Sequence, residues 1–227
     1  MIPDLYIANK NYSSWSLRPW VLMRQLQIPF NERLMPFAGS ETQAIYRTFS
    51  PSGKVPCLLH DDIVVWDSMA IFEYLADIHP QVWPALAPAR IWARCASAEM
   101  HAGFASLRNI CTMNCGLRVR MSAMEPGLLA DIDRIDALWN QGIECFGGPF
   151  LAGDQFTAVD AAFAPVAFRV QTYNLPMSAV ALEYVDQLLE LAPMRDWYEA
   201  ALLEDWRDEI HEQEAREAGP WLEDLRA

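Results

Sequence analysis

The pattern of apolar and polar positions in the first 78 residues predicts a small sheet covered by helices. Short apolar or alternating runs are typical of strands, and apolar residues three or four positions apart are typical of helices. The expected elements are a strand at 5–8, a helix through 21–26, a strand at 30–35, a short irregular helix over 40–49, a hairpin of strands at 55–60 and 63–66, and a helix at 69–76. The order is βαβαββα, with a parallel start and an antiparallel end.

Beyond residue 88, every long segment has the apolar spacing of a helix. Residues 79–88 contain three prolines and predict a stiff linker. The expected helices are 89–115, 126–146, 161–170 and two or three more within 179–191 and 194–216. We therefore expect an α/β domain over 1–78, the linker over 79–88, and an all-helical domain over 89–227.

Thr157 and Asp160 precede the most apolar of these helices. Their Thr-x-x-Asp spacing is that of a capping box, in which each side chain accepts a hydrogen bond from the other residue's backbone N–H. Phe156, just before the box, can pack against the first turn. Because the helix that follows is almost wholly apolar, we expect it to form the core of the second domain.

Composition narrows the class of protein without indicating an activity. The chain is 52% hydrophobic, enough for well-packed cores, and no segment approaches the roughly 20 uninterrupted apolar residues of a membrane span. No basic-then-apolar leader opens the sequence, and the five cysteines include no C-x-x-C, so we expect reduced thiols in a cytoplasm. Cys111 and Cys115 could share a helix face, where buried thiols are favoured over a redox or metal pair. The four histidines lack the spacing of a zinc site.

The net charge of −13 is concentrated near the C-terminus. Residues 195–227 carry four basic and eleven acidic side chains. Such acidity argues against binding to nucleic acid or to an anionic membrane, because both require clustered Lys and Arg. The simplest interpretation of the acidic segment is a solvated helical face that aids solubility.

The stretch 11–20, Asn-Tyr-Ser-Ser-Trp-Ser-Leu-Arg-Pro-Trp, carries the candidate chemistry. It lies where the first strand passes into the first helix. Serine is a common N-cap, and Pro19 suits a first helical turn. A helix start offers unpaired N–H groups and a partial positive charge, so it can hold an anion. Plain helix capping explains the same residues equally well.

Three motifs, in this order and on this two-domain pattern, resemble those of the cytosolic glutathione transferases. They are Gly53-Lys54-Val55-Pro56, then Asp67-Ser68 leading into Ala70-Ile71-x-x-Tyr74-Leu75, and finally Phe156-Thr157-Ala158-Val159-Asp160. The resemblance spans nearly the whole chain. It implies a thioredoxin-like first domain, with a cis bond before Pro56, and an all-helical second domain.

The same resemblance implies a glutathione site in the first domain. There the backbone of Val55, exposed by Pro56, pairs with the cysteinyl part of glutathione, and Lys54 meets the glycyl carboxylate. Asp67 and Ser68 hold the ammonium and carboxylate of the γ-glutamyl end. From the residues alone, Lys54 is equally well a surface lysine, and Asp67 and Ser68 are a helix cap.

Residues 13–18, Ser-Ser-Trp-Ser-Leu-Arg, are similar to the Ser-Ser-Cys-x-x-Arg motif of the serine-using, zeta-like members. This implies that Ser13 is the catalytic residue, and the alternatives are Tyr12, Ser14 and Ser16. Trp15 stands where the zeta motif has a cysteine tied to maleylacetoacetate isomerisation. That departure weighs against the isomerase activity.

The site for the electrophile is expected between the domains, facing the helix after the linker. Arg108 is seven residues from His101, and Cys111 is three residues from Arg108, so the three could share one face. An arginine there would suit an anionic co-substrate, while a solvated charge or an interdomain ion pair is the plain alternative. The candidates are Trp15, His101, Arg108, Cys111, Met113, Asn114, Arg169 and Tyr173.

Together these features predict a glutathione transferase that conjugates or isomerises small electrophiles, with glutathione as co-substrate and no metal. The alternative is a transferase-fold binding or interaction protein without turnover. A thiol reductase would need a cysteine at the helix start, and residues 13–16 contain none. The resemblance implies a homodimer, and we expect no nucleic-acid or membrane partner.

Overall fold

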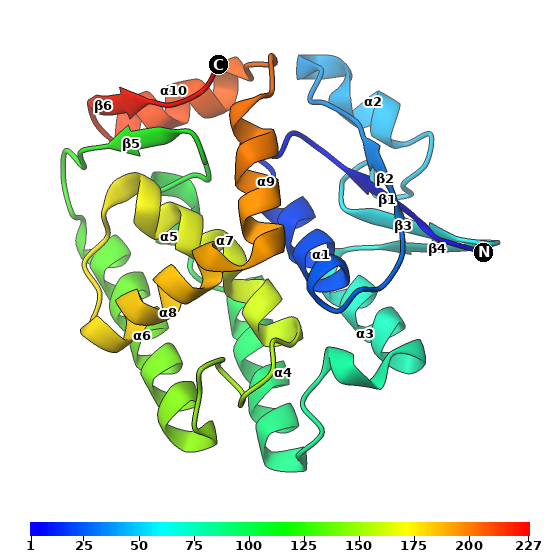
Figure 1. The fold of residues 1–227 in the computed structure, drawn as a ribbon. Helices are drawn as coiled ribbons and strands as arrows, with labels where there is room; N and C mark the ends of the chain where they lie inside the picture. The colour runs from blue at the N-terminus through cyan, green and yellow to red at the C-terminus, as the bar shows by residue number, and fades with distance from the viewer.

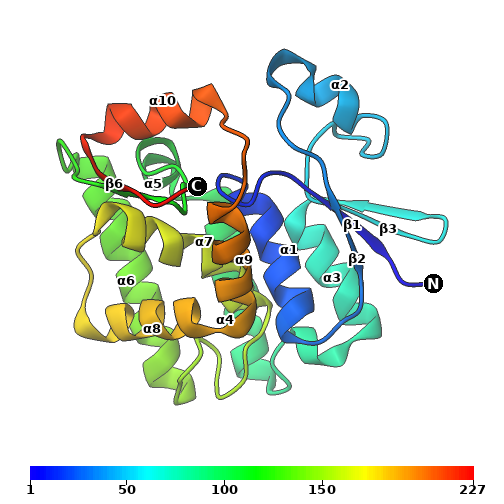
Figure 2. The same cartoon turned by 45° about the horizontal axis from the view of Figure 1, so that its top comes forward.

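The first part of the protein is a four-stranded sheet with helices on both faces, seen in a computed structural model that describes residues 1–227 (Figure 1). Its elements are β1 (Asp4–Ile7), α1 (Ser14–Gln25), β2 (Asn31–Leu34), η1 (Gly39–Glu41), α2 (Thr42–Tyr46), β3 (Cys57–His60), β4 (Ile63–Trp66) and α3 (Ser68–Ile78). The strand order is β2-β1-β3-β4, with β1 parallel to β2 and the other pairs antiparallel. Helices α1 and α3 lie on one side of the sheet and α2 on the other (Figures 1 and 2). This confirms the predicted thioredoxin-like order.

The second part is helical, as predicted, with one short pair of strands added to it. After η2 (Pro80–Val82), its elements are α4 (Ala87–Ala102), α5 (Ala105–Ile110), β5 (Leu117–Val119), α6 (Pro126–Phe146), α7 (Ala158–Tyr173), α8 (Ala179–Glu190), α9 (Ala192–Leu202), α10 (Glu209–Ala218) and β6 (Trp221–Asp224). The pairing of β5 with β6, which brings the C-terminal segment back beside the chain that follows α5, was not predicted. No helix combines the length and the apolar character needed to cross a membrane.

The first helix begins earlier than predicted. Helix α1 starts at Ser14, so Pro19 lies in the helix interior rather than in the first turn. A proline there leaves the carbonyl of Trp15 without its helical donor. The helix persists because tertiary burial outweighs that loss: most of the side chains from Ser14 to Met23 are buried, and α1 packs along α7.

The long helix predicted over 89–115 is wrong, because the chain forms two helices there. Helix α4 begins at Ala87, two residues before the predicted start, and ends at Ala102. Phe104, which is buried, adopts a left-handed backbone conformation with φ 60° and ψ 45°, and α5 then begins at Ala105. A left-handed residue interrupts the helical hydrogen-bond ladder. His101 and Arg108 therefore belong to different helices, and the argument that they share a helix face fails.

Helix α7 is the centre of the second part and packs against both α1 and α4. All but one of its residues are buried, as its apolar sequence predicted. The predicted capping box is present: the Asp160 carboxylate accepts from the backbone N–H of Thr157 at 2.8 Å. The same carboxylate also accepts from the N–H of Leu151 at 3.0 Å and from the Tyr184 hydroxyl at 2.8 Å. Burial raises the pKa of Asp160 to about 6, although these hydrogen bonds act in the opposite direction.

Replacing Asp160 tests whether this carboxylate holds the start of α7. In Asp160→Ala, the N–H groups of Leu151 and Thr157 and the hydroxyl of Tyr184 lose their buried acceptor. We expect the free energy of unfolding to fall by about 3–5 kcal/mol, measured by urea denaturation. Asp154, an exposed residue of the preceding loop, is the control, and Asp154→Ala should change stability by less than about 0.5 kcal/mol. Equal effects of the two changes would contradict the proposed role of Asp160.

Candidate functional site

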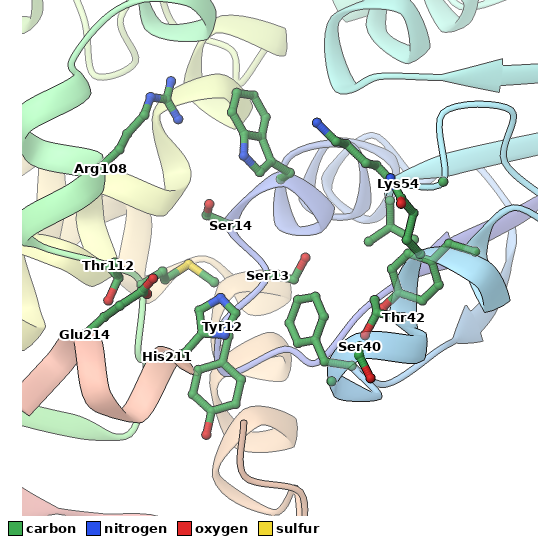
Figure 3. A pocket seen from close by; sticks show the side chains of 18 of the residues that line it. Tyr12, Ser13, Ser14, Ser40, Thr42, Lys54, Arg108, Thr112, His211 and Glu214 are labelled. Atoms are coloured by element: carbon green, nitrogen blue, oxygen red, sulfur yellow. The ribbon is translucent and has the colours of Figure 1, made fainter. Parts of the chain in front are cut away.

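Two neighbouring cavities open around the start of α1. The larger one, of about 550 Å³, lies between the first part of the chain and helices α5, α7 and α10 (Figure 3). The smaller one, of about 500 Å³, lies between the β3–β4 hairpin, the start of α3 and the end of α4. Trp15, Lys54 and Val55 line both cavities. The two cavities therefore share one wall, which contains the indole of Trp15.

Ser13 caps α1 by position and lines the larger cavity. Its hydroxyl donates to Ser16 Oγ at 2.7 Å, and Ser16 Oγ also accepts the backbone N–H of Ala8 at 3.1 Å. The backbone N–H groups of Trp15 and Ser16, in the first turn of α1, donate to no acceptor within the protein. Ser13 thus lies beside the positive end of a helix, next to donors that are not yet used.

The chain just before Ser13 is held in place by residues from the second part of the chain. The Glu204 carboxylate accepts the backbone N–H of Lys10 at 2.6 Å and that of Asn11 at 3.2 Å. The indole N–H of Trp197 donates to the Lys10 carbonyl at 2.8 Å, and Asn11 Nδ2 donates to Asn114 Oδ1 at 2.9 Å. We call residues 10–12 the clamped loop. It fixes where α1, and with it Ser13, begins.

Tyr12, the third residue of the clamped loop, directs its hydroxyl away from Ser13 (Figure 3). That hydroxyl donates to Glu212 Oε1 at 2.7 Å and accepts from the guanidinium of Arg226. Burial, reinforced by the neighbouring Glu212 carboxylate, raises the pKa of Tyr12. Of the serine alternatives, Ser14 lines the larger cavity, whereas Ser16 is buried beneath Ser13.

The acidic C-terminal segment is not simply a solvated face. Glu204 and Glu212 are 6% and 4% exposed, and both are hydrogen-bonded to the clamped loop. Arg226, whose side chain is 1% exposed, pairs with Glu212 and with Asp224. These residues were missed because an acidic residue in an acidic segment carries no local signal of burial.

The residues expected to hold glutathione gather around the smaller cavity. Lys54, Val55, Pro56, Asp67 and Ser68 line it, and the Val55–Pro56 bond is cis, as the resemblance implied. Lys54 is exposed and forms no ion pair. Ser68 Oγ is buried and has no hydrogen-bond partner.

Asp67 caps α3, as predicted. Its Oδ1 accepts the N–H of Met69 at 2.8 Å, and its Oδ2 lies 3.4 Å from Nε2 of His101. Burial lowers the pKa of His101, the Asp67 carboxylate partly offsets this, and Arg18 and Arg108 lower it further. The carboxylate of Asp67 is thus already shared between a helix cap and an imidazole.

The candidates for the electrophile site divide into three groups. Trp15, Arg108, Met113 and Arg169 line the larger cavity, and His101 lines the smaller one. Cys111, Asn114 and Tyr173 line neither cavity, because they are buried behind it.

The buried candidates have structural contacts instead. The Tyr173 hydroxyl donates to the carbonyl of Thr112 at 2.8 Å, and Asn114 bonds to the clamped loop. Burial raises the pKa of Cys111 to about 12, and Cys115 is fully buried, as the buried-thiol interpretation predicted.

Sequence reasoning missed His211 and Glu214, which line the larger cavity from α10. The His211 ring stacks on Tyr12, with ring centres 5.0 Å apart, and on Phe37, with ring centres 5.1 Å apart. These contacts place α10 over the start of α1. Their only sequence signal was a histidine in an acidic helix.

Comparison with known proteins gives the same fold class that the strands and helices define, a thioredoxin-like domain followed by a helical domain. A glutathione transferase homologue from Burkholderia, solved with bound glutathione, has a TM-score of 0.66 and 20% identity, covering 88% of this chain and 98% of its own. An unclassified glutathione S-transferase from Bombyx mori has a TM-score of 0.72 and 18% identity, covering 97% of this chain and all of its own.

The sequence comparisons define the family. Residues 12–78 match the model of the glutathione S-transferase N-terminal domain, and residues 117–200 match that of the C-terminal domain. The chain therefore belongs to the glutathione S-transferase family. A probable maleylacetoacetate isomerase from Caenorhabditis elegans is 25% identical over 78% of this chain and 82% of its own length. The rat maleylacetoacetate isomerase is 22% identical with the same coverage.

The contact between His101 and Asp67 can be tested by NMR titration of the histidine rings. We expect the pKa of His101 to lie below the ordinary value near 6.5, because burial and two nearby guanidiniums disfavour the imidazolium. In Asp67→Asn the pKa should fall further, because the only nearby charge that favours the protonated ring is lost. A rise in that variant would contradict the contact. His60, which is bonded to Tyr74 away from this site, is an internal reference.

Proposed function

We propose that this protein is a glutathione transferase in which Ser13 activates the glutathione thiol for attack on a small electrophile. The single observation that carries the proposal is the position of Ser13. It lies at the start of α1, on the larger cavity, whose wall includes Lys54 and Val55, two of the residues expected to bind glutathione. Family membership supports glutathione as the co-substrate.

Glutathione would occupy the smaller cavity and reach Ser13 across the shared wall. Lys54, exposed and without an ion pair, would meet the glycyl carboxylate, and Val55 would pair with the cysteinyl backbone. Asp67 would meet the γ-glutamyl ammonium. Ser68, whose buried hydroxyl has no partner, would donate to the γ-glutamyl carboxylate. This binding mode leaves the sulfur near Ser13 and the larger cavity for the electrophile.

The chemistry requires the thiol to lose its proton near neutral pH. A thiol pKa of roughly 8.5–9 must fall by about two units, which corresponds to about 3 kcal/mol of preference for the thiolate. A hydrogen bond from Ser13 and the partial charge of the α1 terminus each contribute about 1–2 kcal/mol. The proton leaves to solvent, the thiolate forms the C–S bond, and the leaving group departs with its electron pair.

Ser16 positions Ser13 for this task. Its Oγ already accepts the N–H of Ala8, so its own proton is available to donate to Ser13. When Ser13 turns its proton toward the sulfur, Ser16 can donate to Ser13 Oγ in return. The two hydroxyls then form a short chain in which each bond strengthens the next.

Isomerisation is a second candidate activity, because the relatives include maleylacetoacetate isomerases. Trp15, which occupies the position of the zeta motif's cysteine, weighs against it. A binding protein without turnover is the remaining alternative, since one fold hosts unrelated functions. Measured turnover separates an enzyme from a binding protein: a protein that binds glutathione but neither conjugates nor isomerises an electrophile is a binding protein.

We further propose that the protein is a cytoplasmic homodimer. All five cysteines are free thiols, which suits a reducing compartment. Ile63, Val64 and Trp66 of β4 are 49%, 38% and 46% exposed, so an apolar edge of the sheet is available for a symmetric partner. Sedimentation equilibrium would detect the dimer, and a monomer at micromolar concentration would exclude it.

The role of Ser13 is tested by Ser13→Ala, assayed with glutathione and a neutral aryl halide. We expect turnover to fall about 10- to 100-fold, the equivalent of one lost charge-assisted hydrogen bond, with the pKa of bound glutathione raised. Binding of glutathione, measured by calorimetric titration, should be nearly unchanged. Ser16→Ala should give a smaller loss of turnover with the same sign.

The matched control is Ser122→Ala, since Ser122 is exposed and lines neither cavity. It should leave both turnover and binding unchanged. Full turnover in Ser13→Ala would transfer the role to Ser14 or Tyr12. Absence of glutathione binding in the unmodified protein would overturn the proposed function itself.

A further inference from the structure

Three arginines from three helices lie near one another beside the larger cavity: Arg18 from α1, Arg108 from α5 and Arg169 from α7. The guanidinium carbons of Arg18 and Arg108 lie 4.1 Å and 4.7 Å from the centre of the Trp15 ring. These two cations can therefore be no farther apart than the sum of those distances. Arg108 and Arg169 line the larger cavity, and Arg18 lies buried behind Trp15.

None of the three arginines has a carboxylate partner. Arg108 donates only to the carbonyls of Gly103 and Met100, and Arg169 only to those of Cys111 and Pro165. Arg18 is 1% exposed, and its Nε and Nη2 have no hydrogen-bond partner at all.

Their environment is correspondingly unfavourable for positive charge. Burial first, and then the charge of Arg108, lowers the pKa of both Arg18 and Arg169, the latter to about 10. Asp67 and Asp131 are the acidic groups near Arg18 and Arg108, but neither pairs with them directly. Glu214 is the one carboxylate that lines the larger cavity, and it forms no ion pair.

Two other cations of low exposure have carboxylate partners, whereas the half-buried Arg90 and Arg118 bond only to carbonyls and a hydroxyl. Lys10, with 11% side-chain exposure, pairs with Glu32 at 2.6 Å, and the buried Arg226 pairs with Glu212 and Asp224. With 30 acidic residues in the chain, partners are not scarce. A buried charge is costly unless an opposite charge compensates it. The buried Arg18 and Arg169, with the half-buried Arg108, therefore form a cation cluster that an anion from outside the protein would stabilise.

We propose that the larger cavity binds an electrophile that carries a carboxylate, held by Arg108 and Arg169. Arg18, behind Trp15, reinforces the positive potential without touching the ligand. A planar guanidinium presents paired N–H donors that match a carboxylate. The identity of this ligand as the second substrate rests on the proposed function; the existence of an anion site does not.

The placement of Arg108 favours the electrophile over glutathione as the occupant. In Figure 3, Arg108 lies to the left and Lys54 to the right, and Ser13 lies lower in the view, below the line that joins them. A carboxylate at Arg108 and glutathione at Lys54 would therefore bring the two reactants to Ser13 from different sides. If the glycyl carboxylate of glutathione lay at Arg108 instead, Lys54 would be left without a ligand.

The test uses two electrophiles with the same reacting carbon and leaving group, the anionic 4-chloro-3,5-dinitrobenzoate and its neutral methyl ester. For each, kcat/KM is divided by the uncatalysed rate, and the carboxylate-to-ester ratio is compared among variants. In Arg108→Gln and in Arg169→Gln we expect this ratio to fall about tenfold or more, as for a lost charge-assisted hydrogen bond. Arg108→Lys, which keeps the charge but loses the fork, should lie between. It also keeps the test usable if Arg108→Gln does not fold.

Arg195 supplies the matched control. It is a surface arginine paired with Glu190, and Arg195→Gln should leave the ratio unchanged. A ratio that is the same in the unmodified protein and in the Arg108 and Arg169 variants would overturn the proposal. So would a loss of glutathione affinity in Arg108→Gln with the ratio preserved, because the arginine would then serve glutathione.

A second readout does not depend on turnover. Calorimetric titration without glutathione should show that the unmodified protein binds 4-nitrobenzoate but not methyl 4-nitrobenzoate, and that Arg108→Gln binds the anion at least tenfold more weakly. If neither electrophile is conjugated, the proposed function fails, yet anion binding would still support this site. Conjugation of the neutral ester together with no binding of 4-nitrobenzoate would overturn the anion site and leave the proposed function standing.

Discussion

The hydrogen bonds that hold the clamped loop are the constraint on which the candidate site depends. Ser13 follows this loop directly, so the position of its hydroxyl is set by where Lys10 and Asn11 are held. Glu204, Trp197 and Asn114 bond to those two residues, and all three belong to the second part of the chain. The start of α1 is therefore not a property of the first domain alone. The helical domain supports the site from outside, as a rigid second layer of contacts does.

The same dependence runs through α7. Its start is fixed by the Asp160 carboxylate, and its length packs along both α1 and α4. Arg169 lies about three turns beyond Ala158, the first residue of α7, so its position beside the cavity depends on where α7 begins. A shift at the capping box would move Arg169 relative to Trp15. Capping, burial and the charge around the cavity are thus linked in one rigid helix.

Features with a local signal could be predicted from the sequence, and features made by distant contacts could not. The capping box, the helix from Pro126 to Phe146 and the β3–β4 hairpin each follow from residues close in sequence. The break before α5 has one local signal, Gly103, which forms the C-cap of α4 and was not used in the prediction. The left-handed conformation of Phe104 has none, because it is costly for a phenylalanine and is held there by burial.

The candidate site divides in the same way. The serine-rich start of α1 and the residues expected to bind glutathione were both predicted from short motifs, and the structure brings them to adjoining cavities. Glu204 and Glu212 look like surface residues in sequence, and only the folded chain shows that they face backbone N–H groups and a buried arginine. His211 likewise acquires its place from stacking between Tyr12 and Phe37. The residues of the short motifs could be predicted from the sequence, whereas the distant residues that hold them in place could not.

At position 15 this chain has a tryptophan where the zeta-like motif has a cysteine, and the structure shows what the tryptophan contacts. A bulky indole there lines both cavities and offers its π-face to Arg18 and Arg108. A cysteine could do neither, because it is small and presents no ring to a guanidinium. With Trp15, part of the cost of holding two cations close together is offset by the ring. Trp15 thus lies next to Ser13 in the sequence and next to Arg18 and Arg108 in space, and it lines both cavities.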